Sequence, residues 1–225
     1  PMQTPAGALA DVVAGLRRIE SFAGAIVSMP HKTALVPLVD ELTPAAAAAG
    51  AVNVLRRERD GRLVATLLDG EGFVAGLRAE GRDVGGNHCL LVGAGGAASA
   101  IGLALAAHGA ASVTIVNRTP AKAAALADRV RAAFPNVHVA LGDALGRRYD
   151  LAVNATSLGM RDGDAAPMTD DQIDRATLVA ECVVAPELTA LLARARARGR
   201  GTHSGVPMLH AQIELMLRFM GVAPA

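Results

Sequence analysis

A short apolar run that ends in glycines constrains the fold of this chain more than any other feature. Residues 88–96 read HCLLVGAGG, and the alanine-rich stretch AASAIGLALAAHG follows. This order predicts a buried strand, a tight turn and a helix that ends near Gly109. The turn contains a GxGxxA pattern formed by Gly93, Gly95 and Ala98. The pattern predicts a nucleotide site, although an ordinary glycine turn can have the same letters.

Each position of this pattern has a physical role in a nucleotide site. Gly93 permits the tight turn, Gly95 lets phosphates approach the backbone, and Ala98 lets the helix pack closely on the strand. The helix N-terminus then offers N–H groups to a pyrophosphate. The surrounding order of strand, turn and helix therefore favours dinucleotide binding over an ordinary turn.

Strand and helix patterns continue to alternate after this turn. Residues 112–117 (SVTIVN) predict a second strand, and residues 119–134 predict a helix with Thr119 as candidate N-cap and Pro120 at the first position. Three more strand-like runs are VHVAL, DLAVNAT and TLVAECVV. We therefore expect an α/β fold with a Rossmann-type, doubly wound parallel sheet at residues 86–204.

The end of the second strand indicates which nucleotide is bound. An NAD site normally has Asp or Glu there, to bind the ribose hydroxyls. Here the sequence reads VNRTPAK, in which Arg118 and Lys122 could hold a 2′-phosphate that an acid would repel. Asn117 and Thr119 add neutral hydrogen-bonding groups. These residues favour NADP over NAD, unless Arg118 is only a solvated loop charge.

A later strand also ends in polar residues. The run VNATSLGM (153–160) places Asn154 and Thr156 at the carboxyl end of its strand, where a parallel sheet would face the cofactor crevice. A polar strand end followed by a helix cap would look the same, so the pattern alone leaves both interpretations open.

The regions on either side of the sheet are smaller. Residues 1–85 predict a small α/β domain, and the Gly-rich, charged stretch AEGRDVGGN (79–87) predicts the linker. Residues 205–225 predict a C-terminal helix that returns to this small domain. Its expected apolar face consists of Leu209, Ile213, Met216 and Met220.

Composition excludes several classes of protein. Hydrophobic residues make up 52% of the chain and charged residues 19%, which is typical of a globular core. A net charge of +1 and only 2% aromatics argue against nucleic-acid partners, and no apolar run is long enough for a membrane span. No Cys/His cluster has metal-ligand spacing, so no metal is expected. Cys89 and Cys182 lie in apolar runs, and buried reduced thiols fit a cytoplasmic protein.

Two residues of the first domain could carry chemistry. In VSMPHK (27–32), Pro30 ends a strand-like run, and Lys32 follows where a partly desolvated lysine can exchange protons. By themselves Lys32 and the acid of LLDGEGF, Asp69, would more often be solvated surface charges. Asn53 in GAVNVL is a polar group in an apolar run and needs a partner if it is buried.

Together these motifs resemble the shikimate dehydrogenase family, which includes shikimate and quinate dehydrogenases. The similar blocks follow the order of the family and run over nearly the whole chain. They are GAIVSMPHK, DELTPAAAAAGAVN, LLDGEGF, GAGGAA, NRTPAKA, VNATSLGM, APELTALL and GVPMLHAQ.

The resemblance implies two domains with the active site in the cleft between them. It implies NADP-linked, reversible reduction of 3-dehydroshikimate to shikimate by a monomer or a homodimer. Lys32 corresponds to the catalytic lysine and Asp69 to the partner that hydrogen-bonds Lys32 and a ring hydroxyl. The implied substrate-binding residues are Ser28, Lys32, Asn53, Asp69 and Gln212. The implied cofactor-binding residues are Gly93, Ala94, Gly95, Gly96, Ala97, Asn117, Arg118, Thr119, Lys122, Asn154, Ala155, Thr156, Val183, Gly205 and Met208.

The chain also departs from the family pattern. Leu67 and Leu68 replace the usual Asn-Thr before Asp69, Ile26 replaces an asparagine, and Val184 replaces a tyrosine. The family's first strand, with its paired serines, is missing from the sequence, which begins at Pro1, so we expect an upstream segment.

Because these polar groups are replaced, the sequence does not determine which substrate is bound. The replacements predict weak binding of shikimate, or a related cyclic hydroxy acid such as quinate or an aminoshikimate as the true substrate. A non-catalytic NADP- or shikimate-binding module is the alternative from a different class. The presence of both Lys32 and Asp69 argues against it.

Overall fold

The computed structural model describes residues 1–144 and 146–222, and the chain forms two compact units. Unit 1 consists of Pro1–Leu68 with the segment from Ile213 onward, and unit 2 consists of Asp69–Gln212. The domain boundaries expected at residues 85 and 204 stay a prediction, since compactness alone does not define a domain. In the described residues, no helix combines the length and apolar character needed to cross a membrane.

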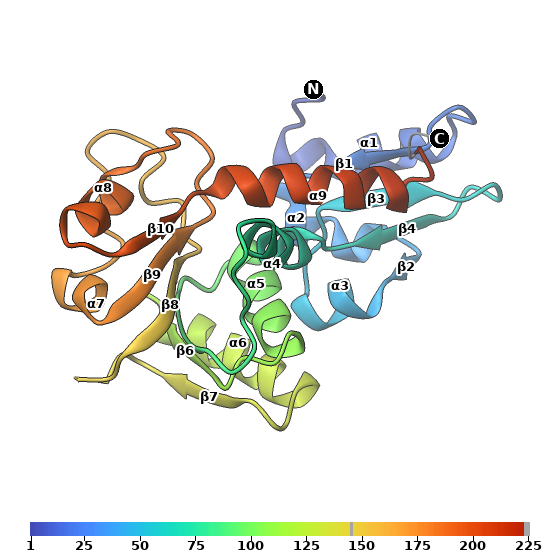
Figure 1. Ribbon diagram of the computed structural model, residues 1–225. Coiled ribbons are helices and arrows are strands. Elements are labelled where there is room, and N and C mark those ends of the chain that lie inside the picture. The colour runs from blue at the N-terminus through green and yellow to red at the C-terminus, as the bar shows by residue number, and fades with distance from the viewer. Residues whose placement is uncertain (145, 223–225) are drawn as a thin grey trace. The chain divides into compact units, whose positions relative to one another are not determined.

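Unit 2 contains a six-stranded sheet in the order β10-β9-β8-β5-β6-β7, and every pair of neighbours is parallel (Figure 1). The order reverses between β5 and β8, which makes this the switch point of a doubly wound sheet. The predicted Rossmann-type fold is therefore confirmed. The strands are β5 (His88–Val92), β6 (Ser112–Val116), β7 (His138–Leu141), β8 (Tyr149–Asn154), β9 (Ala176–Glu181) and β10 (Gly201–His203).

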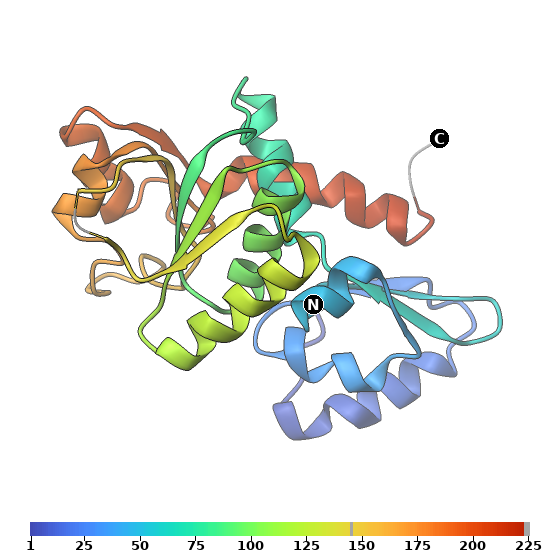
Figure 2. The same cartoon turned by 90° about the horizontal axis from the view of Figure 1, so that it is seen from below.

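Helices cover both faces of this sheet. Figures 1 and 2 show α5 (Gly96–Ala107) and α6 (Pro120–Ala133) on one face, with α7 (Asp170–Asp174) and α8 (Ala190–Ala197) on the other. Covered on both faces, the central strands are continuously apolar rather than alternating. Leu90, Leu91 and Val153, for example, are fully buried.

Helix α4 of unit 2 packs closely on the first part of α9, which belongs to the same unit, because glycines line their contact. α4 spans Asp69–Ala79, and α9 spans Gly205–Phe219. A Cβ atom on Gly76 would lie 2.8 Å from the Met208 nitrogen and 2.9 Å from the Pro207 carbonyl carbon. A Cβ atom on Gly72 would lie 2.6 Å from Cβ of Gln212. The helices therefore approach to a distance that leaves no room for larger residues.

Unit 1 has a small mixed sheet in the order β1-β3-β4-β2. β1 (Gly24–Ile26) and β4 (Leu63–Thr66) pair antiparallel with β3 (Val54–Arg57), whereas β2 (Glu41–Leu42) runs parallel to β4. Its helices are α1 (Leu9–Arg17), α2 (His31–Ala34) and α3 (Pro44–Ala49), with short 3-10 turns at Ala6–Ala8 and Val36–Leu38.

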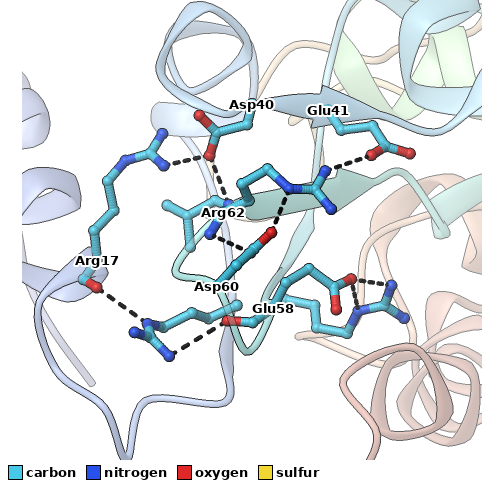
Figure 3. A network of polar contacts seen from close by, with 9 residues as sticks. Arg17, Asp40, Glu41, Glu58, Asp60 and Arg62 are labelled. Carbon is cyan, nitrogen blue, oxygen red and sulfur yellow. Dashed lines mark hydrogen bonds and ion pairs between the residues drawn. The ribbon is translucent and has the colours of Figure 1, made fainter.

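A network of charged residues ties the β3–β4 turn of unit 1 to α1 (Figure 3). Arg17 pairs with Asp40, whose carboxylate also accepts the Leu63 N–H at 2.7 Å. Arg62 binds Asp60 on the turn itself, at 2.9 Å. The hydrogen bonds from Arg17 and from the Leu63 N–H hold the pKa of Asp40 below its usual range. Asp40 therefore contacts both α1, through Arg17, and the start of β4, through Leu63.

The buried face of α9 differs from the expected one. Met208, Gln212 and Met216 are buried, whereas Ile213 is 41% exposed. The prediction was wrong for Ile213 because it sought a purely apolar stripe, and the buried row includes a polar residue. The face of a helix that packs on other elements can include a buried polar residue when the polar groups of that residue find hydrogen-bond partners.

We predict that Gly76→Ala destabilises the protein by about 1–3 kcal/mol, because the new methyl group meets backbone atoms of α9 that cannot turn away. Chemical denaturation followed by circular dichroism measures the change. Gly15→Ala is the control, because Gly15 lies in α1 and nothing is within 4 Å of its Cβ position. The control should stabilise the protein by about 0.5–1 kcal/mol. Equal effects of the two substitutions would contradict the packing argument.

Candidate functional site

The glycine turn of unit 2 has the geometry that its sequence predicts. Gly93 has φ +121°, and a Cβ atom there would lie 2.9 Å from the carbonyl oxygen of Ala155. Gly95 is the N-cap residue of α5, and nothing lies within 4 Å of its Cβ position. Ala94 lies between them, and Gly96 and Ala97 begin the helix. Gly95 is exposed, so the N-terminus of α5 can be approached from solvent, as a phosphate site requires.

The end of β6 carries the predicted NADP residues. Arg118, Thr119 and Lys122 are exposed, and Asn117 is half-buried with its Nδ2 donating to the Thr119 carbonyl at 3.0 Å. Pro120 begins α6 as expected, and Thr119 is its N-cap residue but makes no side-chain capping hydrogen bond. The first turn of α6 has no acid. Two cationic side chains thus stand at a helix N-terminus, which suits an anion.

The end of β8 lies beside the glycine turn, and the end of β9 lies beside the end of β8. The N–H of Ala155 donates to the Val92 carbonyl at 2.8 Å, and the N–H of Gly205 donates to the Val183 carbonyl at 3.0 Å. Val183 and Met208 are buried. The carboxyl edge of the sheet therefore brings predicted cofactor residues from several strands together, as a switch point does.

Asn154 serves mainly to shape its own loop. Its side chain is fully buried, with Oδ1 accepting from the N–H and the hydroxyl of Thr156 at 3.1 and 2.7 Å. Its Nδ2 donates to the Leu158 carbonyl at 3.0 Å. Asn154 therefore shapes a local polar turn, and its role in a cofactor site stays a prediction.

In unit 1, backbone contacts bring three predicted substrate residues together. The N–H of Val52 donates to the Lys32 carbonyl at 2.9 Å, and the N–H of Val27, next to Ser28, donates to the Asn53 carbonyl at 2.7 Å. Lys32 is half-buried in α2, and Ser28 is exposed.

Asn53 confirms that a polar group in an apolar run needs a partner. It is 1% exposed, and its Oδ1 accepts the N–H of Leu68 at 2.9 Å. This bond fixes which end of the carboxamide faces the 67–68 segment.

Asp69 and Gln212 belong to unit 2. Asp69 is 4% exposed and is the first residue of α4, where the helix dipole favours a negative charge. Gln212 is 7% exposed on α9, in the row that meets Gly72 of α4. The roles of Lys32, Asp69, Asn53 and Gln212 in binding and catalysis stay predictions.

The sequence reasoning missed Glu181. This residue ends β9, is fully buried and accepts the hydroxyl of Thr189 at 2.7 Å. Burial raises the pKa of its carboxyl group. An acid inside the apolar run TLVAECVV was the signal that could have found it.

Comparisons with known proteins agree with this geometry. Residues 1–55 match the family model described as shikimate dehydrogenase substrate binding domain, and residues 77–159 match the model described as shikimate / quinate 5-dehydrogenase. The shikimate dehydrogenase (NADP(+)) of Rubrobacter xylanophilus is 39% identical over 230 residues, which cover 100% of this chain and 80% of that protein.

Solved structures are similar over nearly the whole chain. Shikimate 5-dehydrogenase of Thermus thermophilus, in complex with NADP(H) and shikimate, is 32% identical with a TM-score of 0.84, covering 99% of this chain and 81% of that one. The ligand-free 5-ketofructose reductase of a Gluconobacter species is 31% identical with a TM-score of 0.84, covering 97% and 80%. The expected family and fold are confirmed: the chain belongs to the shikimate dehydrogenase family.

Proposed function

We propose that this protein is an NADP-dependent shikimate dehydrogenase. In the reductive direction, NADPH transfers a hydride to the ketone carbon of 3-dehydroshikimate and a proton is added to the oxygen, which gives shikimate and NADP⁺. The observation that carries the proposal is the family membership, to which the exposed basic pair after β6 adds a preference for NADP.

Lys32 supplies the proton in this proposal. Reduction of a ketone develops negative charge on oxygen, and an ammonium group can neutralise it by proton transfer. Asp69 assists by hydrogen-bonding a ring hydroxyl, and Ser28, Asn53 and Gln212 bind the remaining polar groups of the substrate. The Leu68–Asn53 hydrogen bond supports this role of Asn53 because it fixes the carboxamide before substrate arrives.

Arg118 and Lys122 bind the 2′-phosphate of NADP. The guanidinium group of Arg118 can pair with a phosphate through two parallel hydrogen bonds, and Lys122 acts as a point charge. Both side chains are exposed, so phosphate does not have to displace buried contacts in order to reach them.

We expect Lys32→Met to lower kcat by about 10²–10⁴-fold, the usual contribution of a general acid or base. The absorbance of the reduced nicotinamide measures turnover, and calorimetry should give an unchanged Kd for NADPH. Lys122→Met is the matched control, since it removes the other lysine and should raise the Kd for NADPH with little change in kcat. Loss of NADPH binding in Lys32→Met would contradict the role of Lys32 as proton donor.

Arg118→Ser should weaken NADPH binding by about 10–100-fold, because hydrogen bonds to charged groups contribute about 1.5–3 kcal/mol. NADH lacks the phosphate, so its weaker binding should be unaffected. The two Kd values in the wild type and the variant test this assignment. An equal loss for both nucleotides would indicate that Arg118 supports the fold of the turn instead.

A related cyclic hydroxy acid is the second candidate for the substrate. Leu67 is buried and Ile26 is 58% exposed, at positions where the family pattern has polar residues. The similar 5-ketofructose reductase is consistent with a broader range of ketone substrates in this family. A non-catalytic module that binds NADPH without turnover is the remaining alternative.

A substrate panel separates these candidates. We expect a high KM for shikimate in the wild type and a lower one in Leu68→Thr, which restores a hydroxyl group beside Asp69. Initial rates with shikimate, quinate and an aminoshikimate give the ranking of kcat/KM. A higher kcat/KM for quinate would favour the second candidate, and no turnover with any of the three would favour the binding module.

A further inference from the structure

Glu181 is a fully buried carboxyl group with neutral hydrogen-bond donors. Thr189 Oγ1 donates to it at 2.7 Å, and Asn154 Nδ2 donates at 3.4 Å. Burial raises the pKa of the carboxyl, and the two hydrogen bonds oppose that rise. An acid is costly to bury, so a position that served packing alone would be better filled by an apolar residue.

Asn154 links this carboxyl to the loop after β8. A carboxamide has nearly the same shape when its oxygen and nitrogen are exchanged, so its neighbours decide its orientation. Glu181 accepts a hydrogen bond from Nδ2 of Asn154 at 3.4 Å, and so adds to the Leu158 carbonyl in fixing the position of Nδ2. Oδ1 is then left facing Thr156, from which it accepts two hydrogen bonds.

The side chain of Asn154 stabilises the loop after β8 and is not needed to pair β8 with β9. The ends of β8 and β9 are already joined by backbone, because the Cys182 N–H donates to the Asn154 carbonyl at 3.1 Å. Beyond that point, the loop closes through side chains: Thr156 Oγ1 accepts the Leu158 N–H at 3.0 Å, and Asn154 Nδ2 donates to the Leu158 carbonyl. Gly159 lies against the same carboxyl, with its Cβ position 4.0 Å from Glu181 Oε2.

We propose that Glu181 is a positioning residue for hydride transfer: through Asn154 it fixes the 155–158 loop against the nicotinamide half of the cofactor. This inference rests on the proposed function, because it requires that the loop contacts NADPH. Glu181 need not touch cofactor or substrate. Because Glu181 acts through this loop, its replacement should weaken binding of the nicotinamide half of NADPH. Binding of the adenosine half, which the proposed function assigns to Arg118 and Lys122, should not change.

Two ligands separate these halves in a direct test. NADPH contains both, whereas adenosine 2′,5′-bisphosphate has the 2′-phosphate and no nicotinamide. In Glu181→Leu we expect the Kd for NADPH to rise about 10-fold, as the loss of a buried hydrogen-bond partner typically produces. The Kd for the bisphosphate should stay within about twofold, since its contacts lie elsewhere. Calorimetry measures both values, and kcat should fall together with NADPH affinity.

Glu181→Gln distinguishes positioning from bulk packing. A glutamine can accept from Asn154 through its oxygen and donate to Thr189 through its nitrogen, so it should keep the Kd for NADPH within about threefold of wild type. Glu187→Leu is the control, because Glu187 is an exposed acid in the same segment and should change neither ligand.

Three results would overturn the proposal. They are unchanged NADPH binding and kcat in Glu181→Leu, an equal loss of both ligands in that variant, and a Gln variant as impaired as the Leu variant. A wild-type protein that binds NADPH but turns over no substrate would instead overturn the proposed function. The comparison of the two ligands would remain valid in that case.

Discussion

The close approach of Gly93 to the carbonyl of Ala155 is the contact on which the cofactor half of the molecule depends. It lies at the switch point between β5 and β8, where the helices leave the sheet in opposite directions. A side chain at residue 93 would push the two strand ends apart and would also require a strained positive φ. The loop after β8 also closes through side chains, chiefly Asn154 and Thr156, and Glu181 contacts Asn154 from β9.

Local periodicity made much of unit 2 predictable from its sequence. The strand, glycine turn and helix at 88–107, and the proline that begins α6, depend on neighbours a few residues away. Glu181 was missed because its partners, Asn154 and Thr189, come from other elements that only the folded sheet brings near. The face of α9 was misplaced at Ile213 for a similar reason, since burial of Gln212 depends on glycines of α4.

The use of basic residues supports the assigned chemistry. The chain has 22 lysines and arginines, and only Lys32 and Lys122 are lysines. Positive charge is therefore supplied almost entirely by arginine, whose guanidinium group stays protonated and cannot exchange a proton at neutral pH. A lysine at residue 32 provides a group that can give up its proton, whereas lysine at 122 is one of two cations that a phosphate could meet.

The glycine contact between α4 and α9 has an evolutionary consequence. Most packing contacts join two side chains, so a larger residue on one side can be accommodated by a smaller one on the other. At Gly76 the opposing atoms are the backbone of Pro207 and Met208, which every residue type shares. No second substitution can therefore compensate for a change at residue 76. Lineages that keep this helix pairing must keep the glycine, and sequence drift in this part of the molecule is confined to the other faces of the two helices.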